Sequence, residues 1–145
     1  MSEDTKPEIT LEDARKRLDD LAARHAARTK RDETADTLAE LARAEILDAL
    51  EDKYGPVGKS LAVIAVGDEP DAPMVVVKRP VYATFRKFQD SKQSANDAAG
   101  ALVKPCLVHP DADTYNALIN EYPALLGRVA TAACKLAGYR EDEKR

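Results

Sequence analysis

The stretch KSLAVIAVGDEPDAPMVVVK, residues 59–78, places two short apolar runs rich in β-branched side chains on either side of the turn-forming segment GDEPDAP. Such runs, separated by Gly, Asp and Pro, predict a two-stranded hairpin with apolar side chains on both faces. Two strands alone are only marginally stable in water, so helices have to cover them. The stretch therefore predicts an α+β fold in which helices enclose a short β-hairpin.

Four amphipathic segments follow the hairpin. Pro80 suits the first turn of the first segment, which places Val81, Phe85 and Phe88 on one face. Gly138 suits the C-cap of the last segment. The segments are 81–89, 94–103, 111–122 and 124–137. They predict a mostly α protein whose core contains a bundle of about four short helices.

The residues before Gly55 are rich in Ala, Leu, Arg and Glu, which favour helix. Thr10 suits a helix N-cap, and apolar positions then recur every three or four residues until the pattern breaks at 29–33 and resumes in another register. We expect two helices here, or one helix with a bend. Residues 1–55 carry 15 acidic and 10 basic side chains, whereas the rest of the chain carries 11 and 12. The predicted divisions are an acidic helical arm at 1–53, a hairpin and helical core domain at 54–139, and a charged tail at 140–145.

The 145-residue chain is 44% hydrophobic, which is enough for one independent core. Its net charge of -4 argues against general affinity for nucleic acid. Cys106 and Cys134 are too few for a disulfide framework, so we expect reduced, buried thiols. The segment MSEDTKPEIT lacks the features of a signal peptide, and the longest apolar run, 61–66, is too short to span a bilayer. We therefore expect a cytoplasmic protein with no membrane partner.

The segment GPVGKS at 55–60 invites comparison with a phosphate-binding loop. A Walker A loop needs a glycine five residues before its Gly-Lys pair, and that position is Lys53. The loop should also follow a strand and open a helix, whereas here a predicted helix precedes it and a strand follows. We therefore expect no nucleotide, and instead a helix C-cap at Gly55 followed by a turn.

No segment spells out a catalytic or metal site. Cys106, His109, Asp111 and Asp113 could supply metal ligands, but no second His lies nearby, and catalytic zinc generally needs three protein ligands at fixed spacing. Candidate nucleophiles such as Ser60 have no paired base visible in the sequence. We expect no catalytic residue, no metal, no cofactor and no enzymatic activity.

Residues 78–92 form the strongest local cluster of basic charge, interleaved with aromatic rings. Basic groups and stacking rings together can bind nucleic acid. Helical periodicity instead assigns Phe85 and Phe88 to the core, which leaves Arg86 and Lys87 on a solvated or partner-facing side. Because the chain as a whole is acidic, we do not expect nucleic acid to be the main partner.

Four stretches carry a family resemblance: VVVKRP at 75–80, YATFRKF at 82–88, CLVHPDADTYNALINEYPALLGRV at 106–129, and KLAG at 135–138. Through them, residues 57–138 resemble the tail assembly chaperones of long-tailed bacteriophages and related prophages. The resemblance implies a small helical protein that binds the tape measure protein, a long helical chain. It also implies that this binding keeps the tape measure protein soluble while tail tube subunits assemble.

A protein that binds amphipathic helices needs an apolar stripe and a charged outer face. The predicted partner-binding residues are Leu11, Leu18, Leu21, Leu38, Leu41 and Ile46, together with Arg86 and Lys87. The expected partner is a tape measure or tail tube protein. The same stripe is equally consistent with packing onto the core or with self-association through the N-terminal helices. Two other functions stay open: a structural or connector accessory protein of the virion, and a small nucleic-acid-binding regulator.

Overall fold

The computed structural model describes residues 8–30 and 32–139. The chain divides into two compact units, Met1–Asp36 and Thr37–Arg145. The described residues form six helices and three strands, so the prediction of an α+β, mostly α fold is confirmed. The predicted charged tail at 140–145 lies outside the described residues.

The first unit contains α1, Leu11–Thr29, and the first turn of α2, Glu33–Tyr54. Thr10 caps α1, because its hydroxyl oxygen accepts a hydrogen bond from the backbone N–H of Asp13 at 3.1 Å. Because α1 ends at Thr29 and α2 begins at Glu33, two separate helices are present, which is one of the two arrangements that the sequence allows. No side chain of α1 is buried.

The second unit is built around a three-stranded antiparallel sheet in the order β1-β2-β3. The predicted hairpin is confirmed: β1, Leu61–Ala65, pairs with β2, Met74–Lys78. The third strand, β3, Leu107–His109, pairs with the other edge of β2. The sequence did not predict it, because a strand of three residues, Leu-Val-His, is too short to show an alternating pattern.

Alternate residues of the hairpin enter two separate apolar clusters, so the prediction of apolar side chains on both faces is confirmed. Ile64, Val75 and Val77 belong to the larger cluster, which α4, α5 and α6 complete. Leu61 and Val76 belong to the second cluster on the opposite face. Burial on both faces explains why β2 reads as a nearly continuous apolar run.

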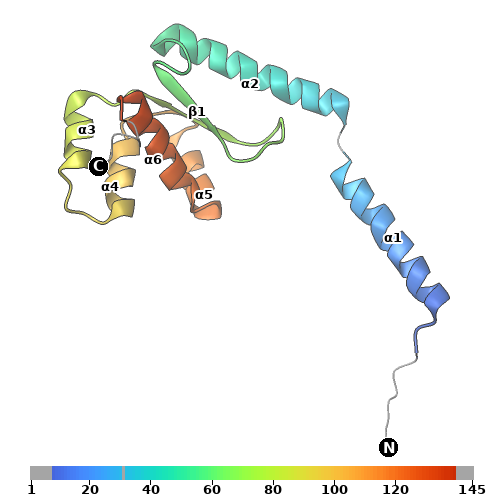
Figure 1. Ribbon diagram of the computed structural model, residues 1–145. Coiled ribbons are helices and arrows are strands. Elements are labelled where there is room, and N and C mark those ends of the chain that lie inside the picture. Colours follow the sequence, from blue (N-terminus) through green and yellow to red (C-terminus); the bar gives the residue numbers. More distant parts are fainter. Residues whose placement is uncertain (1–7, 31, 140–145) are drawn as a thin grey trace, which may run out of the picture. The chain divides into compact units, whose positions relative to one another are not determined.

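The four predicted short helices after the hairpin are present and gather on one side of the sheet (Figure 1). They are α3, Tyr82–Gln89; α4, Ala95–Val103; α5, Ala112–Glu121; and α6, Leu125–Leu136. Phe85 and Phe88 are half-buried against the larger cluster, as expected. Val81 was wrongly assigned to their face: it is the N-cap of α3 and is 65% exposed, because α3 begins one residue later than predicted.

The second half of α2 covers the other face of the sheet. Leu47, Leu50 and Tyr54 pack against the cluster that contains Leu61 and Val76. A hydrogen bond of 2.6 Å from the Nη2 of Arg43 to the carbonyl of Ala72 also joins α2 to the β1–β2 connection. The compact units accordingly divide between residues 36 and 37, whereas the sequence places the boundary between residues 53 and 54.

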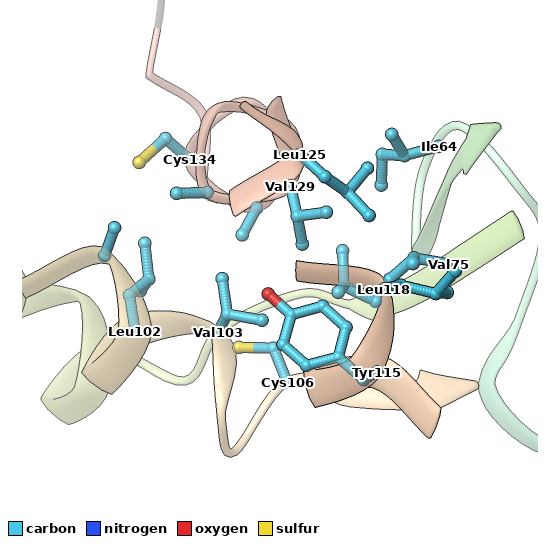
Figure 2. Close-up of a cluster of buried hydrophobic side chains, with 14 residues drawn as sticks. Ile64, Val75, Leu102, Val103, Cys106, Tyr115, Leu118, Leu125, Val129 and Cys134 are labelled. Carbon is cyan, nitrogen blue, oxygen red and sulfur yellow. The ribbon is translucent and has the colours of Figure 1, made fainter. Parts of the chain in front are cut away.

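Tyr115 is the one residue whose buried side-chain oxygen has no hydrogen-bond partner among the described residues. Its ring lies next to Cys106, and its hydroxyl points into the aliphatic cluster, toward Val103 (Figure 2). Burial raises the pKa of this phenol. A buried hydroxyl without a partner loses its hydrogen bonds to water on folding, so it costs free energy instead of contributing it.

We therefore expect Tyr115→Phe to leave the free energy of unfolding unchanged or to raise it by about 1 kcal/mol. Urea denaturation followed by circular dichroism measures the change. The matched control is Tyr139→Phe, which removes a hydroxyl from a partly exposed ring and should have no effect. A clear loss of stability in Tyr115→Phe would show that the hydroxyl has a partner in solution.

Candidate interaction surfaces

The predicted leucines of α1 form an exposed apolar stripe. Leu11, Leu18 and Leu21 are between 57% and 69% exposed. Their spacing of seven and three residues places them on one side of the helix, together with Ala14. No side chain of α1 is buried, so the whole stripe is accessible on this helix.

The predicted partner-binding residues of α2 are exposed. Leu38 and Leu41 are 60% and 54% exposed, and Ile46 is 36% exposed. Leu47 and Leu50, by contrast, pack on the sheet. Leu38 and Leu41 therefore lie on the exposed side of α2, whereas Leu47 and Leu50 lie on the side that belongs to the core.

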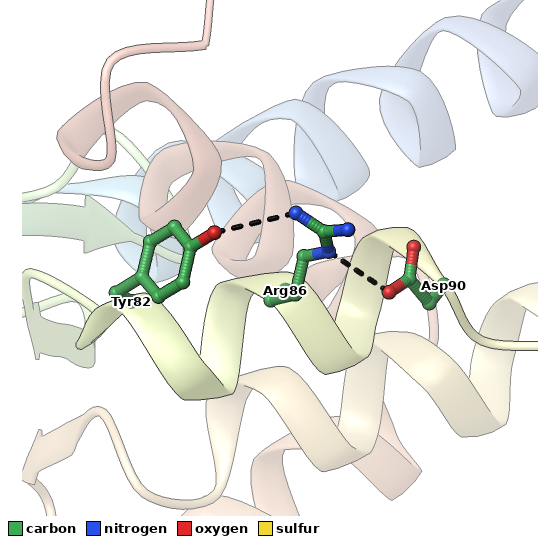
Figure 3. Close-up of polar contacts among 3 residues, drawn as sticks. All are labelled: Tyr82, Arg86 and Asp90. Carbon is green, nitrogen blue, oxygen red and sulfur yellow. Dashed lines mark hydrogen bonds and ion pairs between the residues drawn. The ribbon is translucent and has the colours of Figure 1, made fainter.

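Arg86 and Lys87 are exposed on α3. The Nε of Arg86 donates to Oδ2 of Asp90 at 2.9 Å, and its Nη1 donates to the hydroxyl of Tyr82 at 3.3 Å (Figure 3). The hydrogen bond to Asp90, with the charge of that carboxylate, raises the pKa of the guanidinium. These contacts are spaced four residues apart along the helix and place the guanidinium of Arg86 between Asp90 and the exposed Tyr82.

The predicted site residues thus belong to three helices and to both compact units. The leucines of α1 lie in the first unit, whereas Leu38, Leu41, Ile46, Arg86 and Lys87 lie in the second. On each of these helices the predicted residues are exposed.

A groove of about 320 Å³ lies between α3 and α6. Phe85 and Phe88, with ring centroids 6.3 Å apart, form one wall, and Ala130 and Cys134 belong to the other. The remaining lining residues are Gln89, Thr131, Lys135 and Tyr139. Apolar walls with one amine suit an apolar side chain more than a charged ligand. The sequence did not predict this groove, because its walls come from helices that are distant in the chain.

The glycine-rich segment after α2 is a helix end, as expected. The backbone N–H of Gly55 donates to the carbonyl of Glu51 at 2.8 Å, and Gly55 has a φ of +112°, which a residue without Cβ adopts at little cost. A turn at Gly58 and Ser60 then leads into β1. The order of helix, turn and strand is the reverse of that in a phosphate-binding loop.

Cys106 and Cys134 are free and buried, as the sequence predicts, and burial raises the pKa of both thiols. Burial also lowers the pKa of His109. A hydrogen bond of 2.5 Å from the hydroxyl of Thr114 lowers the pKa of the exposed Asp111 carboxyl. Within the described ranges, no group of three or more His, Cys, Asp or Glu side chains is arranged to hold a metal ion.

Comparisons with known proteins bear on the fold. No protein-family model matches the sequence, and no curated protein matches it either. A solved structure of an uncharacterised protein from Bacillus stearothermophilus is similar, with a TM-score of 0.52 and 20% sequence identity. The match covers 64% of this chain and 92% of that one. In residues 8–30 and 32–139, no helix has both the length and the apolar character to cross a membrane.

Proposed function

We propose that this protein binds a long amphipathic helical client and keeps it soluble, in the manner of the tail assembly chaperones that its sequence resembles. The observation that carries the proposal is the exposed leucine stripe of α1, a helix that buries none of its own side chains. The client would be a tape measure or tail tube protein, met in the cytoplasm of the host cell. The protein would act through binding alone, without catalysis.

The helix α1 has an apolar face that a client could cover. Most helical stability in proteins comes from packing of an apolar face, and α1 buries none of its side chains. A client helix that buried Leu18 and Leu21 would gain about 1.5–3 kcal/mol for each side chain that becomes fully covered. Apolar anchors at helical spacing are the usual basis of helix-in-groove recognition.

The experiment is co-expression with a candidate tape measure protein, followed by affinity capture through a C-terminal tag. We expect the client to appear in the soluble fraction and to be captured with the chain, whereas it should precipitate when expressed alone. A client that stays insoluble in the presence of the chain contradicts the proposal. Incorporation of the chain into purified tail particles would favour the alternative of a structural or connector accessory protein.

The basic face of α3 supports the third candidate, a small nucleic-acid-binding regulator. If nucleic acid were the partner, Arg86→Glu with Lys87→Glu would abolish binding, and modest salt would release it because phosphate contacts are lost steeply with salt. We expect no such binding of nucleic acid. Because exposed charges contribute little beside apolar anchors, the double variant should weaken capture of the helical client only slightly. Filter binding to duplex DNA and to RNA, at low and at physiological salt, measures the competing activity.

Exposed stripes of this kind also support binding to a second copy of the same chain through the N-terminal helices. Self-association would cover leucines on α1 and α2 when no client is present.

A further inference from the structure

The exposed side of α1 has the spacing of a coiled-coil seam. Positions that alternate by three and four residues from Leu11 are Ala14, Leu18, Leu21, His25 and Arg28. In a coiled coil these are the positions that face the partner helix. The seam begins with apolar side chains and ends with a basic one, and Arg28 makes no ion pair with another described residue.

The exposed side of α2 has a seam with the same spacing and the opposite charge. It runs through Leu38, Leu41, Glu45, Asp48 and Asp52, all of them exposed. The residues that pack on the sheet lie on the other side of the helix, so this seam is open to a partner. It begins with two leucines and continues with three carboxylates.

The two seams match in one register. When Leu18 is aligned with Leu38, Leu21 meets Leu41, His25 meets Glu45, and Arg28 meets Asp48. A parallel pair of α2 helices would instead place like carboxylates together at three successive layers, and a parallel pair of α1 helices would place Arg28 against Arg28. Like charges that face each other at such positions are destabilising, so the mixed parallel pair is favoured over both identical parallel pairs.

The flanks of the two seams are compatible with this pairing. Arg17 and Arg24 border the α1 seam, where they would lie opposite Ala42 and Ala49 of α2. No pair of like charges arises there. The long arginine side chains could extend over the small alanines, which covers apolar surface while their charges stay in water.

We propose that α1 of one copy packs in parallel on the outer face of α2 of a second copy, with Leu18 opposite Leu38 and Arg28 opposite Asp48. Three residues connect the two helices of one chain and span at most about 14 Å between residues 29 and 33. The parallel register separates those two residues by about 24 Å along the helix axis. The partner helix must therefore belong to another copy.

This contact joins different surfaces of the two copies. Two copies that exchange it reciprocally, with α1 of each on α2 of the other, form a closed two-fold dimer, whereas a contact that is not returned produces rings or open chains. In either case the average mass in solution should rise with protein concentration. The inference goes beyond the proposed function: the leucines that would hold a client are covered by a second copy, so client and copy compete for them.

Sedimentation velocity of the full-length chain, from micromolar to near-millimolar concentration, tests the inference. One variant carries His25→Glu and Arg28→Glu, and another carries Glu45→Lys and Asp48→Lys. We expect each variant to associate at least about tenfold more weakly than the unchanged chain. An equimolar mixture of the two, or one chain with all four changes, should associate again because opposite charges then face each other.

The control changes are Lys16→Glu on α1 and Glu40→Lys on α2, which alter charge away from the seams and should not weaken association. Circular dichroism checks that every variant keeps its helix content. A chain that stays monomeric at all concentrations overturns the inference. Association that persists in both variants, or that the mixture does not restore, overturns it as well.

Discussion

A chain that lacks residues 1–36 should unfold with the same free energy as the full-length protein, whereas a chain that lacks residues 1–53 should lose about 3 kcal/mol or more. The first deletion removes α1, which buries no side chain. The second also removes Leu47 and Leu50, which cover Leu61 and Val76 on the outer face of the sheet. Urea denaturation of both fragments, followed by circular dichroism, measures the difference.

A matched pair of variants separates the two faces of α2 without truncating the chain. Leu47→Ala with Leu50→Ala should reduce the free energy of unfolding by several kcal/mol, because large-to-small changes in packed clusters typically cost about 2–5 kcal/mol each when the side chain is fully buried. Leu38→Ala with Leu41→Ala makes the same chemical change on the exposed side and should have little effect.

The domain boundary predicted from the sequence implies instead that residues 54–145 keep their full stability. A cooperative transition of unchanged midpoint in that fragment would support the sequence boundary.

Client binding should depend on the leucine stripe of α1. We expect Leu18→Asp with Leu21→Asp to abolish capture of the helical client, because carboxylates would replace the two leucines at the centre of the α1 stripe and would have to be desolvated against an apolar partner surface. The free energy of unfolding of the second unit should not change, since α1 lies in the other compact unit. Affinity capture from co-expressing cells measures binding, and urea denaturation measures stability.

The matched control is Ala23→Asp with Ala27→Asp, which introduces the same charges on the opposite side of α1. This control should retain capture. Salt at about 0.5 M should weaken capture only slightly, because screening acts on the charged flanks and not on the apolar contacts. Capture that survives in Leu18→Asp with Leu21→Asp would place the client on another surface, and the groove between α3 and α6 would then be the next one to test.

Local patterns were sufficient for most of the secondary structure. The Gly, Asp and Pro residues between two β-branched runs predicted the hairpin, and Gly55 predicted the end of α2, because these residue types restrict or permit particular backbone angles wherever they occur. The four short helices after the hairpin followed from apolar spacing. The sequence did not predict β3, because a strand of three residues is too short for a periodic signal. It also did not predict that Val81 is exposed, because the periodic pattern does not fix the first residue of α3 to within one position.

The candidate surfaces could be predicted from the sequence only in part. The sequence by itself determined that α1 and α2 carry leucines at helical spacing, because spacing along one helix is a local property. Only the tertiary structure decided which leucines are free: Leu50 packs on Leu61 and Val76 while Leu38 and Leu41 remain exposed. It likewise decided that Phe85 and Phe88 line a groove with Ala130 and Cys134. Both outcomes depend on which distant segments of the chain pack together. Apolar periodicity predicts that one face of a helix will be buried, but it does not predict which segment will bury it.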